Sequence, residues 1–380
     1  MRDPRIDKLA NVLVNYSVAI RKGDLVRISG PAIAEPLIVA IYREVLAAGG
    51  NPFIRMAPEE CQEIFLKHAS RNQLTFVSPL ARQEVSTINA SIGIWGDENT
   101  KALTNVDPRR QAIVSRARKP LSDIFLKRAA LKGKAKLRWT GTMFPCNAAA
   151  QDAEMSLAEY ENFVYGAGKL DAKDPAAEWR RLSIGQQRLC DVLNKAKEIR
   201  FTTPQGTDLR LGVTGRRWIN CDGHENFPDG EVFTGPIEDA TEGVVCYSFP
   251  AVHGGREADG IRLKFRAGRV VEATATKGED FLIKMLDMDK GSRILGEIAI
   301  GTNYAIQRYT KNTLFDEKIG GTFHAAVGAA YPETGGKNQS GLHWDMVCDL
   351  RRGGRIEIDG RLISRDGRFL NTAWPQPSRR

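Results

Sequence analysis

Residues 324–346 read His324-Ala-Ala-Val-Gly-Ala-Ala-Tyr331-Pro-Glu-Thr-Gly-Gly-Lys-Asn-Gln-Ser-Gly-Leu-His343-Trp-Asp345-Met. Two of the five histidines of the chain lie in this segment. His343 and Asp345 are two residues apart, so on a strand their side chains project from the same face. An imidazole beside a carboxylate is a ligand pair for a divalent metal ion. The apolar run after His324 is typical of a buried strand, and the Gly-Gly-Lys-Asn sequence predicts a loop.

This segment taken alone leaves two interpretations open. The first is a metal site. In the second, the histidines are hydrogen-bonded core residues and His-x-Asp is a chance pattern, because short ligand motifs have real false-positive rates. Residues upstream are needed to decide between the two.

The composition is that of an ordinary globular protein. Of the 380 residues, 42% are hydrophobic and 27% are charged, which allows a large core and, at roughly 150 residues a domain, predicts two domains. No apolar run reaches the ~18 residues of a membrane helix, and the N-terminal residues contain no apolar signal segment. The six cysteines are scattered without a Cys-x-x-Cys pair. We therefore expect free thiols and a cytoplasmic protein without membrane contact.

The formal net charge is +9 and the isoelectric point is about 9.2, a balance that can indicate a nucleic-acid partner. The basic residues are dispersed, however, and the densest run, residues 127–138, alternates with apolar residues. That pattern predicts a helix end leading into a strand with one solvated face. We expect no nucleic-acid partner.

The N-terminal half alternates helix and strand patterns. Strand, helix and strand with short connections predict a parallel β-α-β unit. The predicted helices cover residues 5–20, 35–48 and 105–129, and the predicted strands cover residues 25–29, 52–55, 90–95 and 136–139. No Gly-x-Gly-x-x-Gly follows a strand, and no phosphate-binding loop is present, so no nucleotide cofactor is expected. The sequence predicts an α/β domain with a mainly parallel sheet over residues 1–185.

The pattern changes after a long amphipathic helix predicted at residues 175–194. Short strands at turn spacing predict a β-rich, mostly antiparallel domain over residues 186–370. These strands cover residues 198–202, 208–213, 243–249, 261–265 and 269–274, with a helix at 279–286 and a final hairpin at 355–363. Residues 371–380 form a polar tail. The expected fold class is α/β for the first domain and α+β overall.

Two glutamates upstream lie in apolar settings. Glu231 follows a Pro-Asp-Gly turn and begins an apolar strand, and Glu297 lies between Leu295 and Ile298. A buried carboxylate is costly unless it is paired or bound to a metal ion. The alternative for Glu231 is a carboxylate in solvent at the start of a strand.

Three carboxylates and two imidazoles make a ligand set for two divalent ions. The set comprises Glu231, Glu297, His324, His343 and Asp345. A carboxylate that bridges two ions about 3.5–4 Å apart lets them share a water and lower its pKa. Nitrogen and oxygen ligands without thiolate favour zinc, cobalt or manganese. Cys348 follows Asp345 by three residues, so it faces away on a strand and is not counted.

At these residues the sequence resembles the aminopeptidase T family of dinuclear metal-dependent aminopeptidases, also called thermophilic leucyl aminopeptidases. Six motifs carry the resemblance over nearly the whole chain, and the last four in this order are specific together. They are Leu13-Val-Asn-Tyr-Ser17, Met155-Ser-Leu-Ala-Glu-Tyr160, Pro228-Asp-Gly-Glu-Val-Phe-Thr234, Gly296-Glu-Ile-Ala, His324-Ala-Ala-Val-Gly-Ala-Ala-Tyr331 and His343-Trp-Asp-Met. The resemblance implies an N-terminal α/β domain, a β-rich C-terminal domain that bears the metal site, and a homodimer that partly encloses it.

The resemblance also implies roles for the ligand set. Glu231 and Glu297 are ligands, at least one of them bridging. His324 binds one ion, and His343 with Asp345 binds the other. A metal-bound hydroxide assisted by a glutamate is the nucleophile, which makes Glu231 and Glu297 catalytic as well as ligating.

Tyr331 is implied by the same resemblance to be a catalytic hydrogen-bond donor that stabilises a developing oxyanion. On its neighbours alone it would be a core tyrosine before a proline turn. His224 and His253 match no ligand motif. His224 lies in a Gly/Asp/Asn loop near Glu231, and we expect it at the surface rather than lining a pocket.

Three functions are compatible with these residues. The first is an aminopeptidase that hydrolyses peptides through a two-metal site. The second is an iron-dependent ring-cleaving dioxygenase of dihydroxypyridines, which the scaffold also resembles and which needs only a mononuclear site of two histidines and one carboxylate. Glu231 and Glu297 argue against it, because a mononuclear site has no use for them as ligands. The third is a non-enzymatic binding protein, which predicts a broken ligand set, whereas all five positions are filled.

Overall fold

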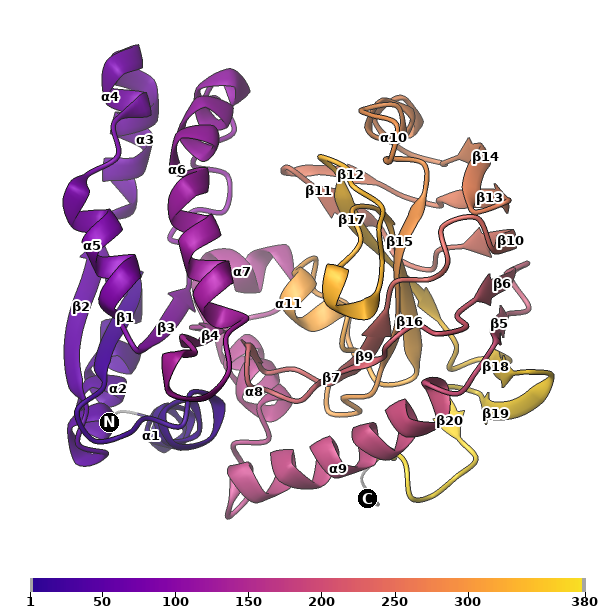
Figure 1. Cartoon of the computed structure of the whole chain (residues 1–380), viewed down its shortest axis with the longest axis horizontal. Coiled ribbons are helices and arrows are strands. Elements are labelled where there is room, and N and C mark those ends of the chain that lie inside the picture. Colours follow the sequence, from indigo (N-terminus) through magenta and orange to yellow (C-terminus); the bar gives the residue numbers. More distant parts are fainter. Residues whose placement is uncertain (1–2, 378–380) are drawn as a thin grey trace. The chain divides into compact units, whose positions relative to one another are not determined.

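The computed structural model describes residues 3–377, and the chain divides into two compact units (Figure 1). The first unit runs to Ala176 and takes in Gly223–Pro228, and the second comprises Ala177–Asp222 and the chain from Asp229 onward. The boundary that we expected near residue 185 lies inside helix α9 (Pro175–Leu193). As a division between independently folding domains, it stays a prediction. Of the predicted polar tail, residues 378–380 lie outside the described residues.

The first unit is built on a parallel five-stranded sheet with the order β2-β1-β3-β4-β8. All of its pairings are parallel, which requires the connecting helices of β-α-β units. The central strand β3 is mostly buried, whereas the edge strand β2 exposes most of its residues. The strands are β1 (Leu25–Pro31), β2 (Asn51–Ala57), β3 (Ala90–Trp95), β4 (Arg138–Met143) and β8 (Asn226–Phe227).

Helices flank this sheet in Figure 1. They are α1 (Pro4–Val12), α2 (Glu35–Ala47), α3 (Glu59–His68), α4 (Arg71–Thr75), α5 (Pro79–Thr87), α6 (Pro108–Ala129), α7 (Asn147–Asp152) and α8 (Leu157–Ala167). A capping box starts α8: Ser156 Oγ accepts from the Glu159 N–H, and the Glu159 carboxylate accepts from the Ser156 N–H. Several predicted bounds differ from the structure. The first helix ends at Val12 and continues as a π-helical turn over Leu13–Ser17. The helix predicted at 105–129 begins at Pro108, and the strand predicted at 136–139 is β4, which runs from Arg138 to Met143.

The second unit contains two large antiparallel sheets. An eight-stranded sheet has the order β14-β13-β10-β6-β5-β18-β19-β20, and a five-stranded sheet has the order β17-β16-β15-β9-β7. The first sheet comprises β5 (Glu198–Thr202), β6 (Asp208–Gly212), β10 (Thr241–Cys246), β13 (Arg262–Arg266), β14 (Arg269–Thr274), β18 (Arg355–Ile358), β19 (Arg361–Arg365) and β20 (Arg368–Phe369). The second comprises β7 (Ile219–Cys221), β9 (Glu231–Thr234), β15 (Leu295–Gly301), β16 (Thr322–Gly328) and β17 (His343–Asp349). A two-stranded ribbon, β11 (Ala251–His253) with β12 (Arg256–Ala258), and the helices α9, α10 (Glu279–Leu286) and α11 (Thr313–Asp316) complete the unit.

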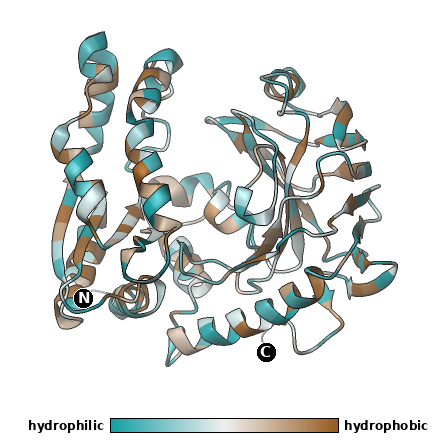
Figure 2. Ribbon diagram, viewed as in Figure 1, coloured by the Kyte–Doolittle hydropathy of each residue, from teal (hydrophilic) through white to brown (hydrophobic). Residues whose placement is uncertain are grey.

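The two large sheets share one hydrophobic core. Alternate residues of β15, β16 and β17 belong to this core together with residues of the eight-stranded sheet. Phe323 of β16 stacks on Phe201 of β5 with ring centroids 4.2 Å apart, and Figure 2 shows hydrophobic residues along the central strands. Because side chains alternate along a strand, the opposite face of the five-stranded sheet, called the site face below, receives His324, His343 and Asp345.

A β-bulge in β15 turns Glu297 onto the site face. Leu295 and Glu297 are two residues apart but pair with adjacent residues of β16, so Gly296 is the extra residue of the bulge. Without the bulge, Glu297 would follow Leu295 onto the core face. The bulge also requires a glycine, because a Cβ on Gly296 would lie 2.3 Å from the Gly328 carbonyl oxygen.

The predicted fold class is confirmed. The N-terminal sheet is parallel and the later sheets are antiparallel, and the strands predicted between residues 198 and 274 correspond to β5, β6, β10, β13 and β14. The final hairpin is β18 with β19. Between residues 3 and 377, no helix combines the length and the apolarity that crossing a membrane would demand.

We predict that Gly296→Ala destabilises the protein by roughly 1–3 kcal/mol, because the new methyl group must displace the backbone of β16. Urea unfolding followed by circular dichroism measures the change. Gly93→Ala is the matched control on a strand of the first unit, where the nearest atom to the added Cβ is 3.8 Å away. An unchanged unfolding midpoint for Gly296→Ala would contradict the tight bulge.

Candidate metal centre

Four strands of the site face bring together the five residues that the sequence singled out as ligands. Glu231 lies on β9, Glu297 on β15, His324 on β16, and His343 and Asp345 on β17. The first three are buried, with exposed fractions of 6%, 4% and 1%. The two on the edge strand β17 are partly exposed, so the cluster has an inner end and an outer end.

The two histidines present the same ring nitrogen to this cluster. His343 Nδ1 lies 2.8 Å from the carbonyl oxygen of Ala329, and His324 Nδ1 lies 3.3 Å from that of Glu317. A carbonyl oxygen only accepts hydrogen bonds, so each Nδ1 carries a proton and each Nε2 is left for a ligand. A backbone carbonyl on the second nitrogen is the usual support of a metal-binding histidine.

Glu297 lies between the two imidazoles. Its Oε1 is 3.2 Å from His324 Nε2, and its Oε2 is 3.4 Å from His343 Nε2. Asp345 Oδ1 is 3.2 Å from His343 Nε2 and 3.8 Å from His324 Nε2. A divalent ion held between these Nε2 atoms and carboxylate oxygens would replace the protons that the two kinds of group otherwise share. Atoms of Glu297, His324 and Asp345 all lie within 4.8 Å of one another.

Glu231 connects the cluster to a buried lysine. Its Oε1 is 3.4 Å from Lys318 Nζ, and the ammonium also pairs with the Glu317 carboxylate. The other oxygen, Glu231 Oε2, is buried without a hydrogen-bond partner and lies 3.6 Å from His324 Nδ1. A buried acceptor without a donor is costly, and metal ligation would satisfy it. Glu231, Glu317 and His324 form a second group with ligand atoms close enough for a metal ion.

The backbone around Glu231 is held from two sides. On one side, Asn303 Nδ2 donates to the carbonyl oxygen of Asp229 at 2.8 Å. Gly230 lies so close to Asn303 that a Cβ at residue 230 would approach the Asn303 Cβ to 2.6 Å. From helix α9, Gln186 Nε2 donates to the carbonyl oxygen of Glu231 at 2.8 Å. These contacts fix the backbone at Glu231, from which the side chain reaches Lys318.

The ionisation of the carboxylates differs between the two ends of the cluster. Burial raises the pKa of Glu231 and raises that of Glu317 well above its usual range, although Lys318 opposes both shifts. For Asp345, burial raises the pKa, but the hydrogen bond with His343 and the charges of His343 and His324 together outweigh it and hold the pKa low. Burial lowers the pKa of His343, but its hydrogen bonds with Asp345 and Glu297 raise it to about 12. At the inner end of the cluster, the Lys318 ammonium alone therefore does not compensate the negative charge that the buried carboxylates of Glu231 and Glu317 would carry.

The outer end of the cluster lies beside Tyr331, which is 41% exposed. Its ring centroid is 5.3 Å from that of His343 and 5.3 Å from that of Phe233. Partial burial and the carboxylates of Glu297 and Asp345 raise the pKa of Tyr331. The phenol therefore keeps its proton at neutral pH and can donate a hydrogen bond.

The other three histidines are not among the ligand residues of this cluster: two pack against aromatic rings and one is exposed to solvent. His253 on β11 packs against Trp344 with ring centroids 5.6 Å apart. His224, in the first unit, lies against Tyr16 at 4.8 Å and is partly buried. His68 is exposed at the end of α3.

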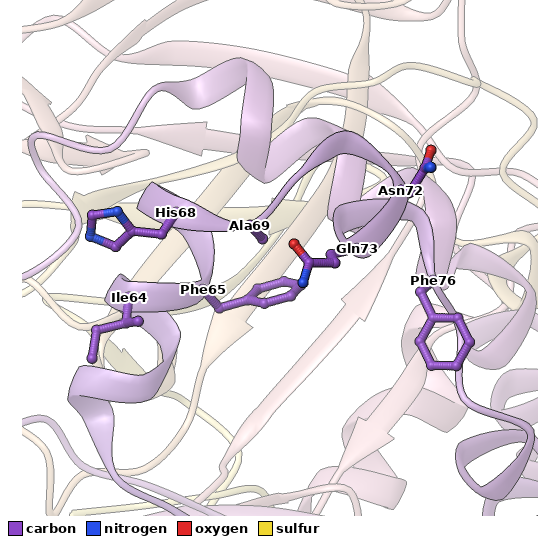
Figure 3. A pocket seen from close by; sticks show the side chains of 7 residues that line it. All are labelled: Ile64, Phe65, His68, Ala69, Asn72, Gln73 and Phe76. Carbon is purple, nitrogen blue, oxygen red and sulfur yellow. The ribbon is translucent and has the colours of Figure 1, made fainter.

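A separate hollow of about 610 Å³ lies along α3 and α4 in the first unit (Figure 3). Figure 3 shows one imidazole among apolar and amide side chains. The lining residues are Ile64, Phe65, His68, Ala69, Asn72, Gln73 and Phe76. No carboxylate or thiol is among them, so this hollow offers no ligand set comparable to the one on the site face.

Glu317 and Lys318 were missed in the sequence. They lie in the Glu-Lys-Ile-Gly-Gly segment between α11 and β16, a polar stretch with glycines that is typical of a surface loop. The available signal was their position a few residues before His324. Asp229, named only as part of a turn, is also buried next to the cluster.

Comparison with known proteins gives a consistent result along the sequence. The profile of the family described as thermophilic metalloprotease (M29) matches residues 2–369. The chain is 27% identical to aminopeptidase 2 of Geobacillus stearothermophilus over 405 residues, which covers 96% of this chain and 95% of that protein. It is 30% identical to aminopeptidase T of Thermus aquaticus over 309 residues, or 72% of each chain.

Two solved structures share the fold. Wild-type AmpT from Thermus thermophilus matches with a TM-score of 0.83 and 25% identity, covering 97% of this chain and 99% of that one. A 2,5-dihydroxypyridine dioxygenase from Pseudomonas putida matches with a TM-score of 0.63 and 12% identity, covering 97% and 98%. The second likeness is one of fold alone.

Proposed function

The chain belongs to the thermophilic metalloprotease family M29, and from this premise we propose that it removes N-terminal residues from peptides with a water activated between two divalent ions. Membership of the family, together with relatives that are aminopeptidases, makes the protein a metallo-aminopeptidase and a hydrolase. The number of ions, their ligands and the catalytic roles are the proposal. The observation that carries it is Glu297, whose two oxygens each face a different histidine.

The charges of the cluster support two ions. Five carboxylates lie in or beside it, those of Asp229, Glu231, Glu297, Glu317 and Asp345. When all five are ionised, as metal binding would require, the Lys318 ammonium neutralises one negative charge and leaves four, the number that two divalent ions carry. Buried charges that are not compensated are expensive. Zinc, cobalt or manganese suits the mixture of imidazole and carboxylate ligands.

The geometry supports a division of labour among the ligands. Glu297 would be the ligand shared by both ions, because its Oε1 lies at His324 Nε2 and its Oε2 at His343 Nε2. Glu231 is tied to Lys318 through Oε1, so it contributes through Oε2 alone. His324 and Glu231 would hold one ion at the inner end of the cluster, and His343 and Asp345 would hold the other at the outer end.

When bound, the ions supply Lewis acidity and lower the pKa of a shared water. The residues of the chain then position the reactants and move protons. A glutamate of the cluster accepts a proton from the attacking water, and returning that proton to the amine of the leaving peptide completes the hydrolysis. Tyr331 donates a hydrogen bond from its phenol to the oxyanion that develops on the scissile carbonyl.

The dioxygenase hypothesis has less support than the aminopeptidase proposal. Its likeness to this chain is one of fold at 12% identity, and fold alone does not determine chemistry. A mononuclear iron site would also leave Glu231 and Glu297 without a role as ligands.

The homodimer and the cytoplasmic location expected from the sequence remain part of the proposal. Light scattering would test the first, and cell fractionation would test the second.

We predict that Glu231→Gln lowers hydrolysis of leucyl-anilide by about a hundredfold or more, because a neutral amide replaces an anionic ligand of the metal centre. The assay is run after zinc, cobalt or manganese is added back to metal-free protein. Glu333→Gln makes the same chemical change at an exposed position and should keep full activity. A Glu231→Gln protein as active as the parent would rule out the proposed role.

We predict that Tyr331→Phe lowers kcat by about a hundredfold, the usual effect of removing one donor to an oxyanion, while the metal content stays that of the parent. Steady-state kinetics and metal analysis on the same preparation measure the two effects. Tyr42→Phe, at an exposed tyrosine of α2, is the control. If kcat is unchanged, Tyr331 has no part in the reaction.

A further inference from the structure

Lys318 is a charged residue in the interior of the second unit. It is 1% exposed, and its ammonium pairs with Glu231 Oε1 and with the Glu317 carboxylate. A side chain this deeply buried does not reach a peptide at the outer end of the cluster. Its contribution to the reaction must therefore act through the carboxylates that it contacts.

The carboxylates on this side of the cluster form a ligand set of their own. Cys221 Sγ, an Asp229 oxygen and a Glu231 oxygen lie within 4.8 Å of one another, and Glu231 belongs to a second such group with Glu317 and His324. Lys318 pairs with Glu231 and Glu317. Asp229 and Glu231 are 2% and 6% exposed. Such a group attracts a divalent cation, because burial makes uncompensated negative charge expensive.

We propose that the Lys318 ammonium is a built-in cation that occupies the position an additional divalent ion would take between Glu231 and Glu317, beside Asp229. Lys318 is thus a positioning residue for the metal centre. It excludes divalent ions from the space around its own ammonium and confines them to the Nε2 atoms of His324 and His343. The effect of Lys318 on catalysis rests on the proposed metal centre. Its role in excluding an additional ion can be tested independently of that centre.

The contacts of Glu231 show why the exclusion of an ion by Lys318 affects the metal centre. With Oε1 held by the ammonium, Glu231 has one oxygen left, the unpartnered Oε2 beside His324. A divalent ion in place of the ammonium would compete for both oxygens and draw the carboxylate away from His324. A lysine is suited to the task because its ammonium is a compact point charge on a long stem.

The test compares two substitutions that remove the charge but differ in volume. Lys318→Ala opens the space and leaves the carboxylates facing it, whereas Lys318→Met keeps the space filled with an apolar chain. Metal-free preparations of both variants and of the parent are dialysed against Mn²⁺, and the bound manganese per chain is counted by mass spectrometry. Thermal unfolding is recorded with and without Mn²⁺.

We expect Lys318→Ala to bind one ion more per chain than the parent and to gain more thermal stability from Mn²⁺ than Lys318→Met does. Lys318→Arg, which keeps the charge, should hold the parent's number of ions. Equal counts in the parent, Lys318→Ala and Lys318→Met would overturn the proposal, as would an equal response of the Ala and Met variants to Mn²⁺.

A double variant covers the case in which Lys318→Ala does not fold. Lys318→Ala with Glu317→Gln removes one charge of each sign, so it should fold and bind the parent's number of ions. A double variant that also fails to fold would assign Lys318 a packing role and contradict the proposal. The count in the parent itself tests the two-ion centre, so failure of the proposed function and failure of this inference give different results.

Discussion

The constraint on which this structure depends is the burial of several carboxylates in one place. Glu231, Glu297 and Asp229 are nearly inaccessible to solvent, and Glu317 and Asp345 lie beside them. Negative charges brought together in a protein interior repel one another and lose their hydration, so they persist only with cations among them. One of these cations is part of the chain, the Lys318 ammonium. We propose that the others are divalent ions bound at the two histidines.

The fold supplies a rigid support for this costly arrangement. One face of the five-stranded sheet packs against the eight-stranded sheet in a continuous apolar core, which leaves the other face free for polar side chains. Alternation along β16 and β17 sends His324, His343 and Asp345 to that face. The bulge at Gly296 adds Glu297 to them, and the turn at Gly230 holds the start of β9, where Glu231 lies.

Much of this arrangement could be predicted from the sequence, because it follows from short-range patterns. The spacing of His343 and Asp345 gives their common face, and the apolar neighbours of Glu297 indicate its burial. The bulge could not be predicted, since a glycine beside a glutamate does not reveal a shift in strand pairing. Lys318 and Glu317 were missed because a polar segment with glycines normally lies in solvent, and only long-range contacts bring it to the cluster.

The number of divalent ions per chain tests the central claim most directly. Freshly purified protein is analysed by mass spectrometry for zinc, cobalt, manganese and iron, with the protein concentration determined by amino-acid analysis. The account predicts two ions per chain, a number that falls when Glu297 is replaced by glutamine. A single ion per chain, unchanged by that replacement, would contradict the bridging role of Glu297 and the two-ion centre built on it.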